Sequence, residues 1–138
     1  MLRNIFKSPM KFIRIENIYE SKAIFNLAYV KAKKNDLKAA LELYQEGQKV
    51  AARHNNQEVT EKLKLVKGLY LSFDLQTLRE VFKFFEEKNL YGDMEEYAVA
   101  VADFLTNKED RHDAVDFYQM AIEARKQIQR GKHLNEKM

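Results

Sequence analysis

The feature that most constrains this chain is a set of residues that recurs along it with constant internal spacing. The stretch "NDLKAALELYQEG" (35–47) places Asp36, Ala40, Tyr44 and Gly47 at intervals of 4, 4 and 3. Residues three and four apart share one face of a helix, and aspartate is favoured just before a helix begins. The intervals recur in two further sets, Asp74, Leu78, Phe82, Phe85 and Asp110, Ala114, Tyr118, Ala121. The aspartates are 38 and then 36 residues apart, which indicates an internal repeat.

A second feature shares this period. An apolar pair precedes each set, and these pairs are also 38 and 36 residues apart: Leu27-Ala28, Leu65-Val66 and Val101-Ala102. The repeated unit is therefore a pair of helices joined by a short loop. One proline and four glycines in 138 residues are too few for a β-sandwich or barrel. The periodicity predicts helices at 9–34, with a possible break near Asn17, and at 36–54, 58–71, 74–88, 93–107 and 110–130.

Short-range signals mark the ends of these helices. Helix starts are predicted at Ser8-Pro9, at Asp36, Asp74 and Asp110, and at Asp93 with Glu96 as a capping box. Helix ends are predicted at Asn35, Asn55-Asn56, Asn89 and Gly131. The loops between them are two to five residues long, which makes neighbouring helices antiparallel.

The small residues in the repeated sets have a packing explanation. The second helix of each stacked hairpin must approach both its own partner and the next hairpin, and small side chains permit this. The aromatic residue is expected to fill the gap between three helices, so Leu27, Ala40 and Tyr44 should be buried together. A bulky residue at Ala114 should overpack the third hairpin and cost about 1–3 kcal/mol. A plain three- or four-helix bundle is an alternative, but it explains neither the period nor the aspartates.

This arrangement resembles the tetratricopeptide repeat, which has a period of about 34 and a small–aromatic–small pattern on its second helix. The stretches 35–51 and 109–125 fit that pattern well, whereas Leu78 and Phe85 in the middle copy are bulkier than it requires. The resemblance implies an all-α, tetratricopeptide-like α-solenoid of about three stacked helix hairpins, at about 16–55, 58–90 and 93–131. A leader or capping segment (1–15) would precede this repeat domain (16–134), and a short tail (135–138) would follow it.

A narrower resemblance covers about residues 16–134. The stretches "FEEKNLYGDMEEYAVAVADFL" (85–105) and "AVDFYQMAIEARKQIQRGKHL" (114–134) look like the C-terminal end of the Rap family of response-regulator aspartate phosphatases, which are peptide-controlled quorum-sensing regulators of Bacillus-type bacteria. The stretch "SKAIFNLAYVKAKKNDLKAALELYQEG" (21–47) is similar to a repeat just upstream in that family. The N-terminal bundle that acts on the response regulator has no matching positions. The resemblance therefore implies a C-terminal third of a Rap protein, either a shortened gene product or a fragment.

Composition excludes several classes of function. The chain has no cysteine, no secretory signal pattern and no run of 18 apolar residues, so we expect a cytoplasmic protein that does not span a membrane. Residues 1–34 hold eight Lys/Arg against two Glu, a balance that can attract nucleic acid or anionic lipid but is also typical of a solvated face. No nucleic-acid-binding motif accompanies this charge, so we expect no nucleic-acid partner.

The sequence contains no recognisable catalytic, metal or cofactor site. The histidines His54, His112 and His133 are scattered, without metal-ligand spacing. The pairs Glu86-Glu87 and Glu95-Glu96 consist of neighbours that point apart on a helix. The four glycines are isolated, so no glycine-rich loop could hold a phosphate. We therefore expect a non-enzymatic protein without cofactors.

A binding surface remains. In a helix-hairpin solenoid the first helices line a concave groove, and the residues expected to face it are Lys22, Phe25, Asn26, Tyr29, Lys33, Thr60, Leu63, Lys67, Tyr70, Glu96, Val99, Asp103 and Asn107. The candidate peptide-binding residues among them are Asn26, Tyr29, Lys33, Lys67, Tyr70, Asp103 and Asn107. Asparagine amides can both donate to and accept from a peptide backbone, and lysines suit a carboxylate. Rap proteins bind short peptides on this face, and "FNLA" at Asn26 matches the asparagine-bearing helix of the family.

These observations favour a non-catalytic module that binds a short signalling peptide or protein segment. Assembly through the N-terminal flank, with a copy of itself or a full-length relative, is the alternative, and response-regulator phosphatase activity is a third. Apolar residues crowd the first 18 positions and could cover the chain's own first hairpin or pair two chains into a homodimer. They are Leu2, Ile5, Phe6, Met10, Phe12, Ile13, Ile15 and Ile18. We expect the homodimer.

Overall fold

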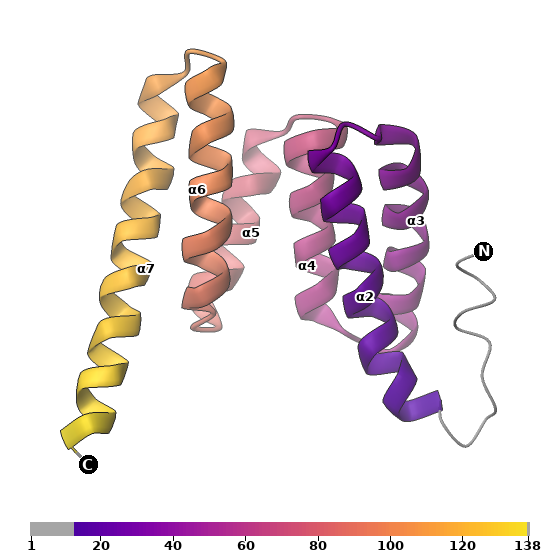
Figure 1. The fold of residues 1–138 in the computed structure, drawn as a ribbon, viewed down its shortest axis with the longest axis horizontal. Coiled ribbons are helices and arrows are strands. Elements are labelled where there is room, and N and C mark those ends of the chain that lie inside the picture. The colour runs from indigo at the N-terminus through magenta and orange to yellow at the C-terminus, as the bar shows by residue number, and fades with distance from the viewer. Residues whose placement is uncertain (1–12, 138) are drawn as a thin grey trace. The chain divides into compact units, whose positions relative to one another are not determined.

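The computed structural model describes residues 13–137, with side chains from 19 to 131. Within this range the chain is helical and contains no strand (Figure 1). The helices are α2 (Ile13–Lys33), α3 (Leu37–Arg53), α4 (Gln57–Val66), α5 (Leu75–Glu87), α6 (Tyr91–Asn107) and α7 (Arg111–Lys137), and a π-helical segment η2 (Lys67–Leu71) continues α4. The predicted all-α fold class is confirmed.

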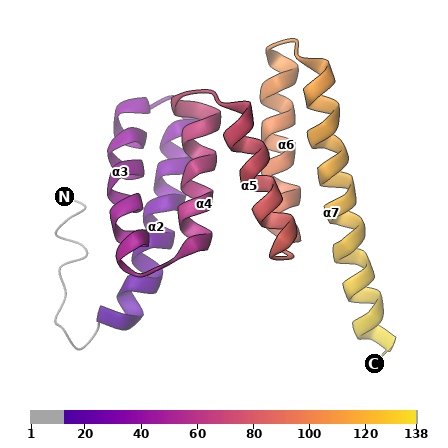
Figure 2. The same ribbon diagram turned by 180° about the vertical axis from the view of Figure 1, so that it is seen from behind.

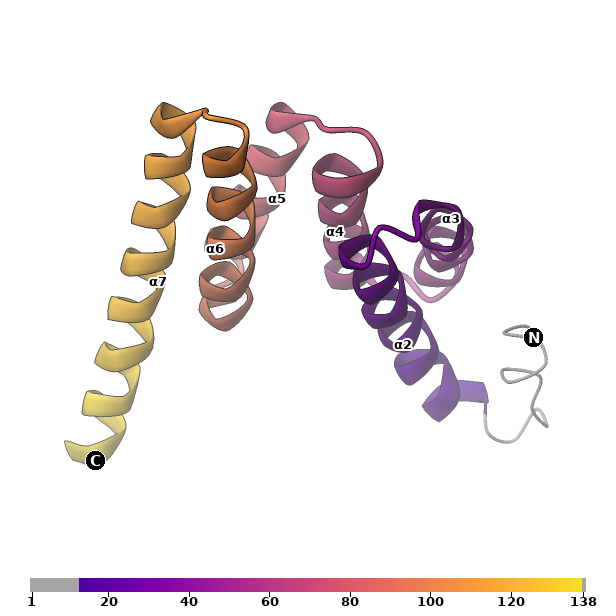
Figure 3. The ribbon, with the colours of Figure 1, turned by 45° about the horizontal axis from the view of Figure 1, so that its top comes forward.

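The chain divides into two compact units, one ending at Leu78 and the other beginning at Arg79. The first unit contains α2, α3, α4 and η2, and both Figure 1 and Figure 2 show α2, α3 and α4 side by side. The second contains most of α5 together with α6 and α7, and Figure 3 shows α6 and α7 running antiparallel next to each other. The leader (1–15) falls almost wholly outside the described residues, as does its predicted start at Ser8-Pro9.

Four of the five turns between helices are built in the same way. Each of these loops has three residues, and the middle one has a positive φ. These residues are Asn35 (65°), Asn55 (55°), Asn89 (58°) and Glu109 (64°). The next backbone N–H then donates back to a carbonyl five residues earlier, at 2.8–2.9 Å. This is the Schellman motif, and asparagine tolerates its left-handed conformation better than most residues do. The predicted ends at Asn35, Asn55 and Asn89 are confirmed.

The predicted aspartate caps are also confirmed. Asp36, Asp74 and Asp110 each accept a bond from the backbone N–H three residues on, at 3.3, 3.2 and 3.2 Å. The bond from the Thr77 backbone holds the pKa of Asp74 below its usual range. Asn56, read as a helix end, instead caps α4 through the Val59 N–H at 3.2 Å.

Three local predictions are wrong. α6 begins at Tyr91 with Leu90 at the N-cap, so Asp93 lies inside its first turn, where its charge suits the positive helix end. α7 continues through Gly131 to Lys137, because a glycine weakens a helix without necessarily ending it. The possible break near Asn17 is absent, since α2 is continuous from Ile13.

The small stripe of α3 packs as predicted. Ala40 and Val50 are fully buried and Tyr44 is 7% exposed. A Cβ added at Gly47 would lie 2.9 Å from Leu63 of α4 and 3.0 Å from Ile24 of α2. Two neighbouring helices therefore approach α3 at this glycine, which explains why the residue there is small.

Two packing predictions fail in detail. Leu27 is only half-buried, while its neighbour Ala28 is fully buried, because one residue along a helix turns the side chain by about 100°. Tyr118 is 36% exposed and its hydroxyl donates to Asp103 at 2.6 Å, whereas Phe117 is fully buried. Tyr44 has Lys67 of η2 over its ring, but within the described chain no helix follows α7 to cover Tyr118 in the same way.

The core of the second unit is aromatic. Phe82 of α5 stands edge-on to Phe85 at 5.4 Å and to Phe117 of α7 at 5.3 Å, measured between ring centroids. Phe85 also contacts Tyr97 of α6 at 6.2 Å. Ala98 and Ala102 of α6 and Ala114 of α7 are at most 2% exposed. Large rings on α5 thus pack against both helices of the following hairpin.

Candidate functional site

The candidate residues on α2 lie along one face of the helix. Asn26 and Lys33 are exposed, as is Lys22, and Tyr29 is half-buried. Phe25 was also expected on this surface, but it is 1% exposed, and its ring contacts Tyr29 at 6.0 Å and the Lys62 ammonium at 5.8 Å. Since an aromatic ring gains more from burial than from solvent, Phe25 belongs to the core.

Tyr29 is brought to Tyr70 of η2. Their rings meet edge-on with centroids 5.9 Å apart, and their side chains are hydrogen-bonded. Burial raises the pKa of Tyr70, and the bond from Tyr29 works in the opposite direction. The Lys33 Nζ lies 5.3 Å from the centre of the Tyr29 ring. Three candidate residues from two segments therefore form one cluster.

The π-helical segment η2 sets the position of Tyr70. The Ser72 N–H donates to the Lys67 carbonyl at 2.8 Å, a five-residue step that is wider than an α-helical turn. Gly68, within this turn, is buried, and a Cβ there would lie 3.3 Å from Leu78 and 3.4 Å from the Asp74 carbonyl. Lys67 is exposed and lies over Tyr44 of α3, 6.0 Å from its ring centre. The sequence carries no signal that predicted this wider turn.

The other residues expected on α4 do not form a binding surface. Leu63 is fully buried against α2 and α3, because it fills the space above Gly47. Thr60 is half-buried, and its hydroxyl donates to the Asn56 carbonyl at 3.0 Å. The assignment of Leu63 to the groove is therefore wrong.

In the second unit, the four residues predicted on α6 are exposed: Glu96, Val99, Asp103 and Asn107. Asp103 accepts a 2.6 Å bond from the Tyr118 hydroxyl of α7, which holds its carboxylate against the hairpin. Asn107 is the last residue of α6. These residues offer a carboxylate and an amide to solvent on one face of the helix.

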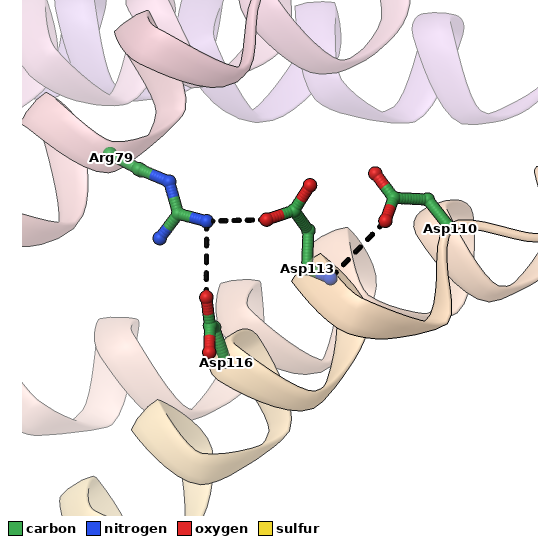
Figure 4. Close-up of polar contacts among 4 residues, drawn as sticks. All are labelled: Arg79, Asp110, Asp113 and Asp116. Atoms are coloured by element: carbon green, nitrogen blue, oxygen red, sulfur yellow. Dashed lines mark hydrogen bonds and ion pairs between the residues drawn. The ribbon is translucent and has the colours of Figure 1, made fainter.

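An ion-pair cluster that the sequence did not predict links α5 to α7 (Figure 4). The Arg79 guanidinium donates to Asp113 at 2.8 Å and to Asp116 at 3.2 Å, both through Nη2. The guanidinium carbon also lies 5.3 Å from the centre of the Phe117 ring. Because both carboxylates already bind the arginine, this cluster is a structural link between helices. The i, i+3 aspartates were visible in the sequence, but their partner 34 residues away was not.

The described side chains form no candidate metal site. Among residues 19–131, no three His, Cys, Asp or Glu side chains come together to hold a metal ion. His54 is half-buried and His112 is exposed, while the side chain of His133 lies outside the described set. None of the described helices combines the length and apolarity needed to cross a bilayer.

Comparison with known proteins gives the family context. No family model matches the chain. It is 31% identical over 130 residues to response regulator aspartate phosphatase A of Bacillus subtilis (strain 168), covering 94% of this chain and 34% of that protein. It is 27% identical over 126 residues to response regulator aspartate phosphatase I of the same organism, covering 91% and 32%. The chain thus spans about a third of the length of these curated relatives.

Two solved structures match the fold. The crystal structure of the apo form of RapI superposes with a TM-score of 0.79 at 27% identity, over 86% of this chain and 44% of that one. The crystal structure of a Rap protein complexed with competence and sporulation factor also gives 0.79 at 27% identity, over 87% and 34%. Sequence and fold together show that this chain is a homologue of the Rap response regulator aspartate phosphatases of Bacillus, and that the homology covers about one third of the length of those proteins.

Proposed function

We propose that the chain is a non-catalytic module that binds a short signalling peptide or a protein segment. In the first unit the contacts are proposed on the exposed faces of α2 and η2, and the second unit offers further candidate residues of its own on α6. The observation that supports this most is the match, over 87% of the chain, to a Rap protein that was solved with competence and sporulation factor. A cytoplasmic location is part of the same proposal.

The chemistry of the exposed residues suits a peptide. An extended peptide presents N–H and C=O groups that lack partners, and an exposed amide such as Asn26 can satisfy one of each. Tyr29 and Tyr70 add apolar ring surface with polar tips, at low cost in conformational entropy. On α6, Asp103 and Asn107 offer an acceptor and a second amide.

Binding is expected to be micromolar or poorer. The chain spans about a third of its Rap relatives, and each 1.4 kcal/mol of lost contact weakens binding about tenfold. Calorimetric titration with competence and sporulation factor, and with a set of synthetic pentapeptides and hexapeptides, tests the proposal. Asn26→Ala should weaken binding about tenfold, whereas Gln45→Ala, which removes an exposed amide from α3, should leave it unchanged. Tight binding that survives Asn26→Ala would locate the site elsewhere.

The non-catalytic part of the proposal has a separate test. Purified protein, mixed in equal amount with a phosphorylated response regulator, should not speed the loss of phosphate. This part of the proposal rests on the sequence, in which no recognisable catalytic motif occurs. Reproducible dephosphorylation, with a contaminant excluded, would refute this part and favour the activity named in its relatives.

A second candidate function is assembly through the N-terminal flank, either as a homodimer or with a longer relative. The observation that favours it is a group of exposed apolar side chains on the first hairpin. These are Tyr19 (67% exposed), Val30 (43%), Leu37 (41%) and Leu41 (44%). Exposed apolar side chains are stabilised when a partner surface covers them. We propose a homodimer.

A further inference from the structure

Lys33, Tyr29 and Tyr70 form a compact group on the first unit, here called the tyrosine–lysine patch. The ammonium of Lys33 lies 5.3 Å from the Tyr29 ring, and that ring meets Tyr70 at 5.9 Å. Lys33 is exposed, and both tyrosines are partly so. The patch therefore places one positive charge and two phenol groups where a ligand can reach them.

The charge of Lys33 is not neutralised within the described chain. No described carboxylate lies within ion-pair distance of it, whereas Lys62 and Lys64 of α4 pair with Glu58 at 3.2 Å and Glu61 at 3.1 Å. The surrounding helix end is also basic, since Lys31 shares the last turn of α2 with Lys33. The electrostatic character of this end of α2 favours an anion.

The hydrogen bond within the patch adds a second donor. The Tyr29 and Tyr70 side chains are hydrogen-bonded, and this bond lowers the pKa of Tyr70. A phenol hydroxyl can donate one bond while it accepts another, so the half-buried Tyr70 can donate to a ligand while it accepts from Tyr29. An ammonium and a phenol that both donate are complementary to a carboxylate.

We propose that the tyrosine–lysine patch binds a carboxylate of the peptide ligand, through the Lys33 ammonium and the Tyr70 hydroxyl. This rests on the proposed function, and it specifies which peptides the surface prefers. The carboxylate is either an acidic side chain or the C-terminal group of the peptide.

The geometry of α2 also sets where the carboxylate lies in the peptide. Lys33 follows Asn26 by seven residues on the same face, which is two helical turns or about 10 Å. An extended peptide advances about 3.3 Å per residue. A peptide held by Asn26 at one residue therefore carries its carboxylate about three residues away.

A purely structural role for Lys33 makes a different prediction. A lysine in the last turn of a helix interacts favourably with the helix dipole. Its loss would then lower thermal stability slightly but would change no preference among ligands. Peptide selectivity distinguishes the two roles.

The probes are pools of fluorescein-labelled hexapeptides in which one position is fixed as Glu or as Gln and the others are neutral. All of these pools carry a C-terminal amide, and one further neutral pool carries a free C-terminal carboxylate. Fluorescence polarisation is measured with wild type, Lys33→Met, Tyr70→Phe and the matched control Lys49→Met. Lys49 is an exposed lysine of α3, so its replacement changes the net charge equally. Thermal melts check that each variant is folded.

We expect about tenfold tighter binding to one Glu pool than to its Gln counterpart, or to the free-acid pool than to the amide. Lys33→Met should abolish this preference, Tyr70→Phe should reduce it about threefold, and Lys49→Met should preserve it. Peptides that bind without any preference for a carboxylate, or with a preference that Lys33→Met retains, would overturn the patch but leave the proposed function standing. Absence of binding by every pool at millimolar concentration would overturn both.

Discussion

Gly47 lies where α2 and α4 both approach α3, and the side chains around it are packed. Leu63 and Ile24, which an added Cβ would meet at 2.9 and 3.0 Å, are at most 1% exposed. Their methyl groups are flexible in principle, but burial leaves them little room to move. At such positions a single methyl group decides how closely two helices can approach.

We predict that Gly47→Ala destabilises the protein despite the better helix propensity of alanine. Overpacking costs about 1–3 kcal/mol, whereas the change from Gly to Ala in a helix contributes about 1 kcal/mol of stability. The net loss should be about 0–2 kcal/mol in the free energy of unfolding, measured by urea denaturation. Gly92→Ala in α6, where a Cβ meets nothing within 4 Å, is the control and should be neutral or stabilising. A Gly47→Ala protein more stable than the control would contradict the close approach.

Glu109 occupies a left-handed position that asparagine occupies in the three equivalent turns. Its φ is 64°, against 65°, 55° and 58° at Asn35, Asn55 and Asn89. A residue with an ordinary Cβ pays about 1–2 kcal/mol there, and asparagine pays less. Glu109→Asn should therefore raise stability by about 0.5–1 kcal/mol, with the midpoint of thermal unfolding as the measurement. The reciprocal change, Asn89→Glu, should lower it by a similar amount, and equal midpoints for all three proteins would argue against strain at this position.

The helices of the second unit are joined by both apolar and polar contacts. α6 and α7 approach each other through alanines, and α5 places Phe82 and Phe85 against them. Arg79 then connects the polar edge of α5 to α7. The two kinds of contact can be tested separately.

Ala114 tests the apolar contact. It is 2% exposed on α7, so Ala114→Leu should overpack the hairpin and cost about 1–3 kcal/mol. Val115→Leu, at a neighbouring position that is 51% exposed, should change stability by less than about 0.5 kcal/mol. The midpoints of guanidinium denaturation compare the two variants. If Ala114→Leu leaves the midpoint unchanged, the close packing of this helix is not supported.

Arg79 tests the polar contact. Its side chain is 37% exposed, so solvent screens the two ion pairs, and we expect Arg79→Gln to cost about 1 kcal/mol. Part of that loss comes from leaving Asp113 and Asp116 close together without a cation. The loss should shrink at 1 M salt, where charges are screened beyond about 3 Å. If the destabilisation does not depend on salt, the contact of Arg79 with the Phe117 ring, and not the ion pairs, accounts for the loss of stability.

At the scale of the whole molecule, the exposed apolar side chains of α2 and α3 bear on the oligomeric state. Tyr19, Val30, Leu37 and Leu41 are about half exposed, so covering them would contribute on the order of 3–6 kcal/mol per chain before association costs. We therefore expect a dimer that dissociates on dilution, measured as molar mass by light scattering across a concentration series. Leu41→Glu, at a position 44% exposed in α3, should shift the protein to monomer, and Val115→Glu on α7 should not. A strict monomer at high concentration would favour the alternative in which residues 1–15 cover their own chain, and their deletion should then cause aggregation.

Short-range physics determined what could be predicted from the sequence. Helix caps at Asp36, Asp74 and Asp110 and left-handed turns at Asn35, Asn55 and Asn89 involve groups within five residues of one another. The repeat period then followed, because the same short-range signals recur, and with it the all-α hairpin fold. For the candidate site, Asn26, Lys33, Asp103 and Asn107 are exposed, and their role in binding stays a prediction.

Contacts between distant residues were decided only by the tertiary structure. Phe25 and Leu63 belong to the core because α2, α3 and α4 converge on them. Helical periodicity alone does not determine whether such a side chain faces the core or the solvent. The cluster of Tyr29, Lys33 and Tyr70 depends on the π-helical turn at η2, and the position of Arg79 depends on carboxylates 34 and 37 residues away. A side chain's partners across helices follow from how the helices pack, and that packing minimises the free energy of many distant contacts at once.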